Sequence, residues 1–210
     1  KKLELQVSIL QALPEVAYTF SDFHILKSSK EMIEQGLRTW HRTKRNPGDI
    51  YGEPIKASSL RLAGTDPEKD IDIYVGNIYR ELLFQPHVLP SSALIRRECI
   101  TPDIRFAEDD YHCGDWEFFA RLSRCYRSVY IDHETTINRS HSDAVRLTQR
   151  SQKVQILCRL NMIRRVWRSD AAFCREHAAD VDRAEGAQLV KLAKLHILDS
   201  ERKDAADALR

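Results

Sequence analysis

The N-terminal stretch has apolar residues at helical spacing, followed by a run typical of a strand. Pro14 ends the helical stripe, because proline cannot continue the backbone hydrogen-bond ladder. The next residues, "EVAYTFSDF", combine valine, tyrosine, threonine and phenylalanine, which suit a pleated sheet. The pattern predicts a helix, then a strand, with exposed polar groups where the strand ends at Ser21 and Asp22. The stripe consists of Leu3, Val7, Leu10 and Leu13.

The middle of the chain alternates between irregular and regular patterns. Residues 41–70 contain three of the seven glycines and three of the seven prolines. This composition predicts a long irregular excursion, and long loops in compact domains are often functional. The apolar spacing then indicates a helix over 71–83, and "HVLPSSALIRRECI" at 87–100 indicates a short buried strand.

From Cys113 the pattern turns helical, then extended, then helical again. "CGDWEFFARLSRCY" predicts a helix that buries one aromatic and aliphatic face. "SVYIDHETTINRSH" predicts one or two strands, and helical spacing continues after His141. We therefore expect an α/β domain over 1–144 and an α-helical C-terminal region over 145–210.

Composition bears on the cellular location of the protein and on the redox state of its cysteines. The chain has 210 residues, 42% of them hydrophobic, but no apolar run approaches the roughly 18–20 residues that a membrane-spanning helix needs. The N-terminus lacks the features of a signal peptide, so we predict a cytoplasmic protein. The five cysteines form no C-x-x-C pair, which favours reduced thiols over a disulfide framework or a zinc site.

Basic residues are concentrated in one segment. Residues 146–168 hold seven Lys and Arg and no carboxylate, a bias that suits phosphates, an anionic membrane surface or acidic neighbours. One interpretation is a peripheral membrane helix; the other is an amphipathic helix packed on the preceding domain with a solvated basic face. We expect no nucleic-acid partner, because the sequence has neither zinc-finger spacing nor an RNP-type aromatic motif.

Asp115 is the first candidate for chemistry. It follows Gly114 at the predicted helix start, where an aspartate accepts hydrogen bonds from free backbone N–H groups. The same position suits a general base at the ligand-binding edge of an α/β fold. The residues alone leave both roles open.

Two further candidates are possible metal ligands. Glu108, Asp109 and Asp110 are hard carboxylates, but consecutive residues seldom converge on one ion, and we favour a solvated loop. His141 follows a predicted strand and is either a structural or surface histidine or a ligand for a divalent metal.

Four segments, taken in order, resemble the C-terminal, acceptor-side half of the catalytic domain of family 2 glycosyltransferases, which are inverting enzymes with a GT-A fold. "KKLELQVSILQALPEVAYTFSDF" resembles the helix and strand that follow the family's metal-binding D-x-D motif. "LPSSALIRRECI" is similar to its strand of small, apolar and Arg-Arg residues, "FAEDDYHCGDWEFFARLSR" to its E-D-W block, and "NRSH" to its R-x-H element. The resemblance covers about residues 1–27 and 77–145, and it implies a partial GT-A sheet with flanking helices.

The resemblance implies an activity: transfer of a hexose from a nucleotide-diphospho-sugar to an acceptor hydroxyl on a glycan or a lipid-linked acceptor, in surface polysaccharide or glycan synthesis. Asp115 matches the family's general base, and His141 matches the histidine that approaches the metal or the donor diphosphate in some relatives. A divalent cation, Mg²⁺ or Mn²⁺, is the implied cofactor. The substrate contacts that the resemblance implies are Asp22, Ser91, Ser92, Trp116 and Arg139; acceptor choice would lie with residues 28–76 and His87.

The sequence departs from the family in two ways. Gly114 stands where the family has the first acid of the E-D pair. The D-x-D motif and the nucleotide-binding strands would precede Lys1, so we expect a fragment of a longer enzyme that is inactive by itself. Two alternatives stay open: a non-catalytic binding module that uses the basic helix of residues 146–168, at the cytoplasmic face of a membrane or on a partner, and a pseudoenzyme that keeps the fold for assembly.

Overall fold

The structure is a computed structural model that describes residues 2–41, 45–60, 62, 70–107, 112–139, 151–199 and 202–208. The chain divides into two compact units. The first comprises 1–105 and 119–144, and the second comprises 106–118 and 145–210. Residues 106–118 therefore belong to the same unit as the C-terminal helices, although they lie within the α/β domain predicted over 1–144.

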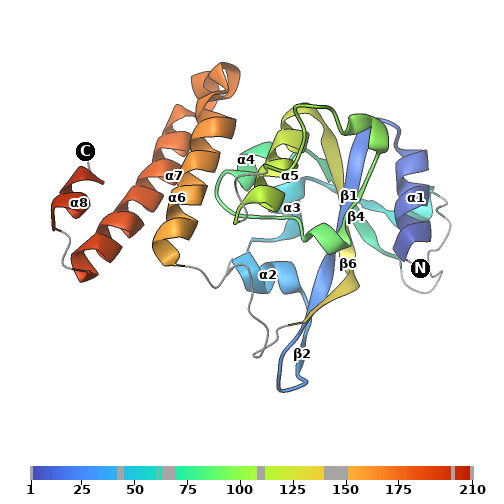
Figure 1. Cartoon of the computed structure of the whole chain (residues 1–210). Helices are drawn as coiled ribbons and strands as arrows, with labels where there is room; N and C mark the ends of the chain where they lie inside the picture. The colour runs from blue at the N-terminus through green and yellow to red at the C-terminus, as the bar shows by residue number, and fades with distance from the viewer. Residues whose placement is uncertain are drawn as a thin grey trace. The chain divides into compact units, whose positions relative to one another are not determined.

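The first unit is built on a six-stranded mixed sheet with the order β2-β1-β6-β4-β3, and β5 pairs with β1. β1 and β6 are parallel along most of their length, whereas β4 runs antiparallel to β6. The register of β1 and β6 shifts on both sides of Asp22. The expected α/β class, with a mixed sheet and flanking helices, is confirmed (Figure 1). The strands are β1 (Val16–Leu26), β2 (Met32–Ile33), β3 (Pro54–Lys56), β4 (Asp72–Gly76), β5 (Leu94–Ile95) and β6 (Arg127–Arg139).

The two faces of this sheet bury different kinds of side chain, aliphatic on one face and aromatic on the other. Because side chains alternate along a strand, Val129 and Ile131 of β6 join an aliphatic core with Leu5 and Ile9 of the N-terminal helix. Tyr130, between them, packs among aromatic rings on the other face. Figure 1 shows α1 on one side of the sheet and α3 on the other. The described helices of this unit are α1 (Lys2–Ala12), α2 (Gly36–His41), α3 (Pro47–Tyr51), η1 (Ala57–Leu60), α4 (Tyr79–Leu82), η2 (Pro90–Ser92) and η3 (Arg97–Cys99), together with the part of α5 (Gly114–Cys125) from Phe119 onward.

The helix expected over 71–83 was wrong. The stretch begins as β4, which pairs with β6, and only the four residues of α4 are helical. Asn77 separates the two elements, and its Oδ1 accepts a hydrogen bond from the backbone N–H of Tyr79 at 2.8 Å. A short apolar run fits both periodicities, and here strand pairing decided between them.

Other expectations for the first unit were right in outline. The N-terminal helix and the strand after Pro14 are confirmed as α1 and β1, and residues 127–139 form the single strand β6. The strand expected within 87–100 is reduced to the two residues of β5 between the short helices η2 and η3. The excursion over 41–70 contains α3, β3 and η1 among its described residues.

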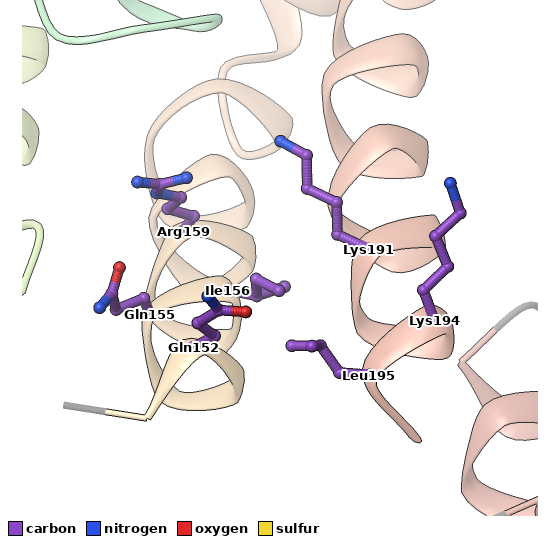
Figure 2. A pocket seen from close by; sticks show the side chains of 7 residues that line it. All are labelled: Gln152, Gln155, Ile156, Arg159, Lys191, Lys194 and Leu195. Carbon is purple, nitrogen blue, oxygen red and sulfur yellow. The ribbon is translucent and has the colours of Figure 1, made fainter. Parts of the chain in front are cut away.

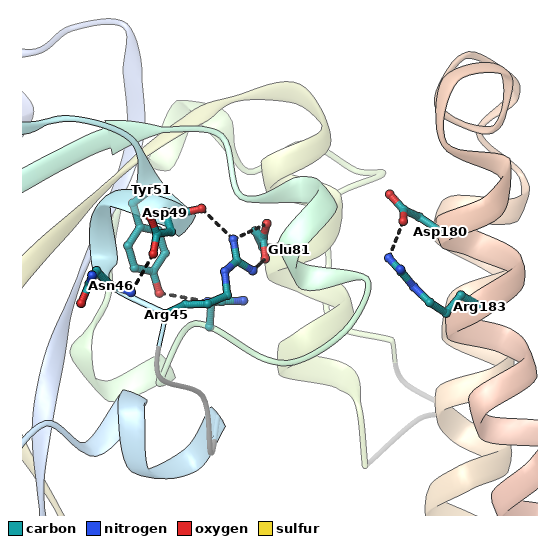
Figure 3. A network of polar contacts seen from close by, with 8 residues as sticks. Arg45, Asn46, Asp49, Tyr51, Glu81, Asp180 and Arg183 are labelled. Atoms are coloured by element: carbon teal, nitrogen blue, oxygen red, sulfur yellow. Dashed lines mark hydrogen bonds and ion pairs between the residues drawn. The ribbon is translucent and has the colours of Figure 1, made fainter.

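The second unit consists mainly of helices after residue 150. α6 (Gln152–Ile163) continues into a π-helical turn, η5 (Arg164–Arg168), and α7 (Ala171–Leu198) and α8 (Arg202–Asp207) follow. Asp170 caps α7 by accepting a hydrogen bond from the Phe173 N–H at 3.1 Å. Ile156, Leu160 and Leu192 form the buried core between α6 and α7. Charged pairs link side chains of these helices, including Asp180 and Arg183 at 2.5 Å (Figure 3).

Candidate functional site

Asp115 is the second residue of α5 (Gly114–Cys125), so it stands in the first turn of this helix. Its Oδ1 accepts a hydrogen bond from the Trp116 backbone N–H at 2.8 Å. The first N–H groups of a helix lack partners within the helix, and Asp115 satisfies one of them. The side chain nevertheless remains exposed to solvent. One carboxylate therefore both accepts a hydrogen bond from the first turn of the helix and remains accessible to solvent.

The surrounding protein changes the acidity of this carboxylate. Partial desolvation raises the pKa of Asp115 above its ordinary value, and the N–H groups of Trp116 and of Asp115 itself oppose the shift. A raised pKa makes the ionised carboxylate a stronger base than an ordinary aspartate. Because the group is also exposed, a proton can reach it.

Two basic residues hold the same helical turn. Glu117 is 1% exposed, and its Oε2 lies 2.6 Å from Nη2 of Arg165 in the π-helical turn. The Arg159 guanidinium lies 5.7 Å from the centre of the Trp116 ring, a cation–π distance. Asp115 and Trp116 were expected to have roles at this site, whereas Glu117 was not. Glu117 could have been found from the sequence, because it lies on the buried face of the predicted helix and a buried carboxylate requires a partner.

Gly114 has space around it. A Cβ built at this position would meet only the Ala107 carbonyl oxygen, at 3.9 Å, which is ordinary contact. The glycine is therefore not required by a close backbone approach within the described structure. A larger residue, such as the acid that the family resemblance implies, would fit here.

Asp22 has a different environment from the one expected. It is 2% exposed, whereas the sequence predicted exposed polar groups at the end of a strand. Its Oδ1 accepts hydrogen bonds from the backbone N–H groups of Phe23 at 2.7 Å and Leu37 at 3.0 Å, and Tyr130 donates to Oδ2 at 3.3 Å. Burial raises the pKa of Asp22, the charge of Glu134 adds to the shift, and the backbone N–H groups oppose it. The carboxylate therefore ties α2 to β1.

Tyr130 connects Asp22 to a second acid. Its hydroxyl lies 3.2 Å from Oδ1 of Asp132, and its ring stacks on Tyr51 with centres 4.4 Å apart. Burial raises the pKa of Tyr130, Asp132 and Tyr51. All three groups therefore favour their protonated forms more strongly than they would in water.

A histidine pair adjoins the tyrosines. The Tyr51 hydroxyl lies 2.9 Å from Nδ1 of His87, and the rings of His41 and His87 are 4.4 Å apart. Burial lowers the pKa of His87 well below the ordinary value, and the charges of His41 and Arg45 act in the same direction. His87 is therefore a neutral, buried part of this cluster. Figure 3 shows Tyr51 near the ion pair in which Arg45 Nη1 lies 2.7 Å from Glu81 Oε2.

The predicted serines occupy the short helix η2. Ser92 is fully buried; its hydroxyl donates to the Leu89 carbonyl at 2.9 Å, and its own carbonyl accepts from the Gln6 side chain at 2.8 Å. Ser91 is exposed, and its carbonyl accepts hydrogen bonds from Lys2 and from Thr136, the latter at 3.4 Å. The serines thus join α1, β6 and η2.

The structure does not bring Arg139 to Asp22. Arg139 is the exposed last residue of β6 and pairs in register with Leu26, whereas Asp22 pairs with Glu134. Five residues of strand separate Glu134 from Arg139, about 16 Å at ~3.3 Å per residue. His141 and the acidic cluster Glu108–Asp110 lie outside the described residues.

The described part of the basic segment 146–168 forms ion pairs within its own unit. Arg164 and Arg168 lie 2.6 and 2.9 Å from Glu185 of α7, and Arg165 pairs with Glu117. Leu157 is 46% exposed, whereas Trp167 is fully buried. No helix in the described parts of the chain is both long and apolar enough to cross a bilayer.

The described side chains bring together no group of three or more His, Cys, Asp or Glu suited to a metal ion. Comparison of the chain with protein-family models, curated proteins and solved structures found no match.

Proposed function

We propose that this chain is the acceptor side of an inverting, GT-A-type glycosyltransferase and that Asp115 is its general base. The observation that carries the proposal is the state of the Asp115 carboxylate. It is exposed, it is oriented by the Trp116 N–H, and its pKa is raised by its surroundings. The order of the family-like segments supports the choice of reaction.

The chemistry assigned to Asp115 is removal of one proton. An acceptor hydroxyl attacks the anomeric carbon of the donor sugar while the bond from that carbon to the nucleoside diphosphate breaks, which inverts the anomeric centre. Asp115 takes the hydroxyl proton as the new bond forms, and the diphosphate leaves with the bonding electrons. Such a base needs a carboxylate within hydrogen-bond reach of the attacking oxygen.

Trp116 and Glu117 support this role as positioning residues. The ion pair between Glu117 and Arg165 anchors the turn that carries Asp115, and Glu117 is almost completely buried. A fixed turn keeps the base in one place, which matters because small displacements of reacting groups cost rate steeply. The indole of Trp116 offers a flat apolar face beside the base.

The implied divalent cation has no set of ligands among the described residues. We therefore derive no step through a metal. The family resemblance implies that its aspartate ligands precede Lys1, and a bound cation would offset the charge of the leaving diphosphate.

The test compares wild type with Asp115→Asn in the complete gene product, because the resemblance places the donor-binding half before Lys1. Donor hydrolysis and transfer are measured with a panel of nucleotide sugars. We expect turnover to fall by about 10²–10⁴-fold, the usual contribution of a general base, with an unchanged circular dichroism spectrum. Asp204→Asn is the matched control, since Asp204 is an exposed acid in the first turn of another helix. Equal turnover in wild type and Asp115→Asn would remove Asp115 from the base role.

The pH profile gives a second test of the same assignment. Activity of the wild type should fall as the pH drops through the raised pKa of Asp115, because protonation removes the base. This acid limb should lie above 3.8, the ordinary aspartate value. An acid limb that persists unchanged in the residual activity of Asp115→Asn would assign the titration to another group.

A further inference from the structure

The second unit contains a hollow of about 370 Å³ between α6 and α7. Figure 2 shows Ile156 and Leu195 pointing toward each other from the two helices, so the floor is apolar. Gln152 and Gln155 of α6 add amide groups at the rim. The volume lies at the lower end of the range of about 300–1,000 Å³ that is usual for small-molecule sites.

Three cationic side chains line this hollow. Arg159 comes from α6, and Lys191 and Lys194 come from α7 (Figure 2). Among the described residues, none that lines the hollow is acidic, and no ion pair involves any of these three cations. Within the described part of the chain, the hollow therefore carries a net positive charge.

Several other cations of this helix pair have acidic partners. Lys153 of α6 pairs with Asp199 at 2.6 Å, and Arg164 pairs with Glu185 at 2.6 Å. In contrast, Lys191 and Lys194 place like charges three residues apart on one helix. Together with Arg159 they concentrate positive charge around the hollow, which favours an anionic ligand.

We propose that this hollow binds the phosphate group of a phosphorylated ligand. Arginine binds phosphate oxygens in a fork geometry, and lysines add point charges. The apolar part of the ligand lies against Ile156 and Leu195. The proposal does not rest on the proposed glycosyl transfer, because the lining and the charge of the hollow are observed independently of Asp115.

The contact between Arg159 and Trp116 allows binding to be followed by tryptophan fluorescence. Its guanidinium lies over the Trp116 ring, and a phosphate that draws Arg159 into the hollow changes the environment of that indole. We expect saturable quenching or enhancement of fluorescence on binding, which is absent in Trp116→Phe.

The experiment measures binding to the chain by calorimetry at low salt, first with inorganic diphosphate and then with vesicles of phosphatidylcholine containing phosphatidic acid. Lys191→Gln and Lys194→Gln each remove one charge. We expect each to weaken binding roughly fivefold, the effect of one unit charge near 4 Å in a water-like medium. Arg175→Gln is the matched control, because it removes a charge from an exposed position of the same helix outside the hollow. It should change affinity less than twofold.

The two arms separate the sources of the phosphate. Binding of diphosphate that both lysine variants weaken supports the site and assigns it to soluble phosphate esters. Binding only to phosphatidic acid vesicles, with the same dependence on the lysines, supports it and assigns it to a lipid headgroup. Absence of binding in both arms overturns the proposal, as does equal weakening by Arg175→Gln. Thermal unfolding of each variant shows that it is folded, and the Trp116 signal of wild type tests the site without any lysine substitution.

Discussion

Replacing Asp22 separates two effects of one buried carboxylate. Asp22→Ala removes the acceptor for the backbone N–H groups of Phe23 and Leu37, both of which donate to Oδ1. Asp22→Asn keeps an oxygen at that position, removes the charge, and replaces Oδ2, the acceptor of the Tyr130 hydroxyl, with an amide NH2 group. Comparing the two variants therefore distinguishes the hydrogen bonds from the cost of burying an ionised group.

The hydrogen bonds set the size of the first effect. A buried donor left without a partner costs about 1–3 kcal/mol, so losing the acceptor for two donors should lower the free energy of unfolding of Asp22→Ala by about 2–6 kcal/mol. This is a large part of the roughly 5–15 kcal/mol that stabilises a typical domain. The N–H of Leu37 should also exchange with solvent much faster, because Asp22 is its partner.

The charge sets the sign of the second effect. Burial raises the pKa of Asp22 above 3.8, so the folded protein holds this proton more tightly than the unfolded chain. Stability from this group is therefore present below 3.8 and is lost as the pH rises through the folded pKa. Asp22→Asn does not undergo this loss, and it should be at least as stable as wild type at pH 7.

The assay is urea unfolding followed by circular dichroism at several pH values between 4 and 8, with hydrogen exchange at the Leu37 amide. The stability of Asp22→Asn relative to wild type should increase with pH and then become constant. A relative stability that decreases as the pH rises would refute the reasoning, because it would mean that the N–H groups favour the ionised carboxylate more than burial disfavours it. A cost for Asp22→Asn equal to that of Asp22→Ala would show that Oδ1 is not the essential acceptor.

Two further sets of substitutions test packing and charge. Gly36→Ala should lower stability by about 1–3 kcal/mol, because its Cβ would lie 2.5 Å from the Phe23 carbonyl oxygen. Gly186→Ala has nothing within 4 Å of its Cβ and should raise stability by up to about 1 kcal/mol. Thermal unfolding measures both changes, and equal shifts would contradict the close approach of Gly36 to Phe23. Arg165→Met should cost about 1–3 kcal/mol, a value discounted for the 35% exposure of the arginine, because it leaves Glu117 buried without this cation. Glu117→Gln should cost less by calorimetry, and the reverse order would be inconsistent with a buried acid.

Local pattern was sufficient for some elements and insufficient for others. α1 and β1 follow from spacing and composition, and Pro14 separates them as expected. The structure of residues 71–83 does not follow from spacing and composition, because their few apolar residues fit a helix or a strand equally well. Pairing of Ile73 with Ile131, 58 positions away in the chain, made it a strand.

The sequence by itself determined the α/β class, the helix that begins at Gly114, and Asp115 as a candidate in its first turn. These depend on neighbours within a few residues, and periodicity records such neighbours. Only the tertiary structure decided the surroundings that control chemistry. The carboxylate of Asp22 is enclosed because α2 folds back onto β1, and Glu117 acquires Arg165 from 48 positions later. Burial and charge pairing arise from contacts between distant segments, and a local pattern carries no record of them.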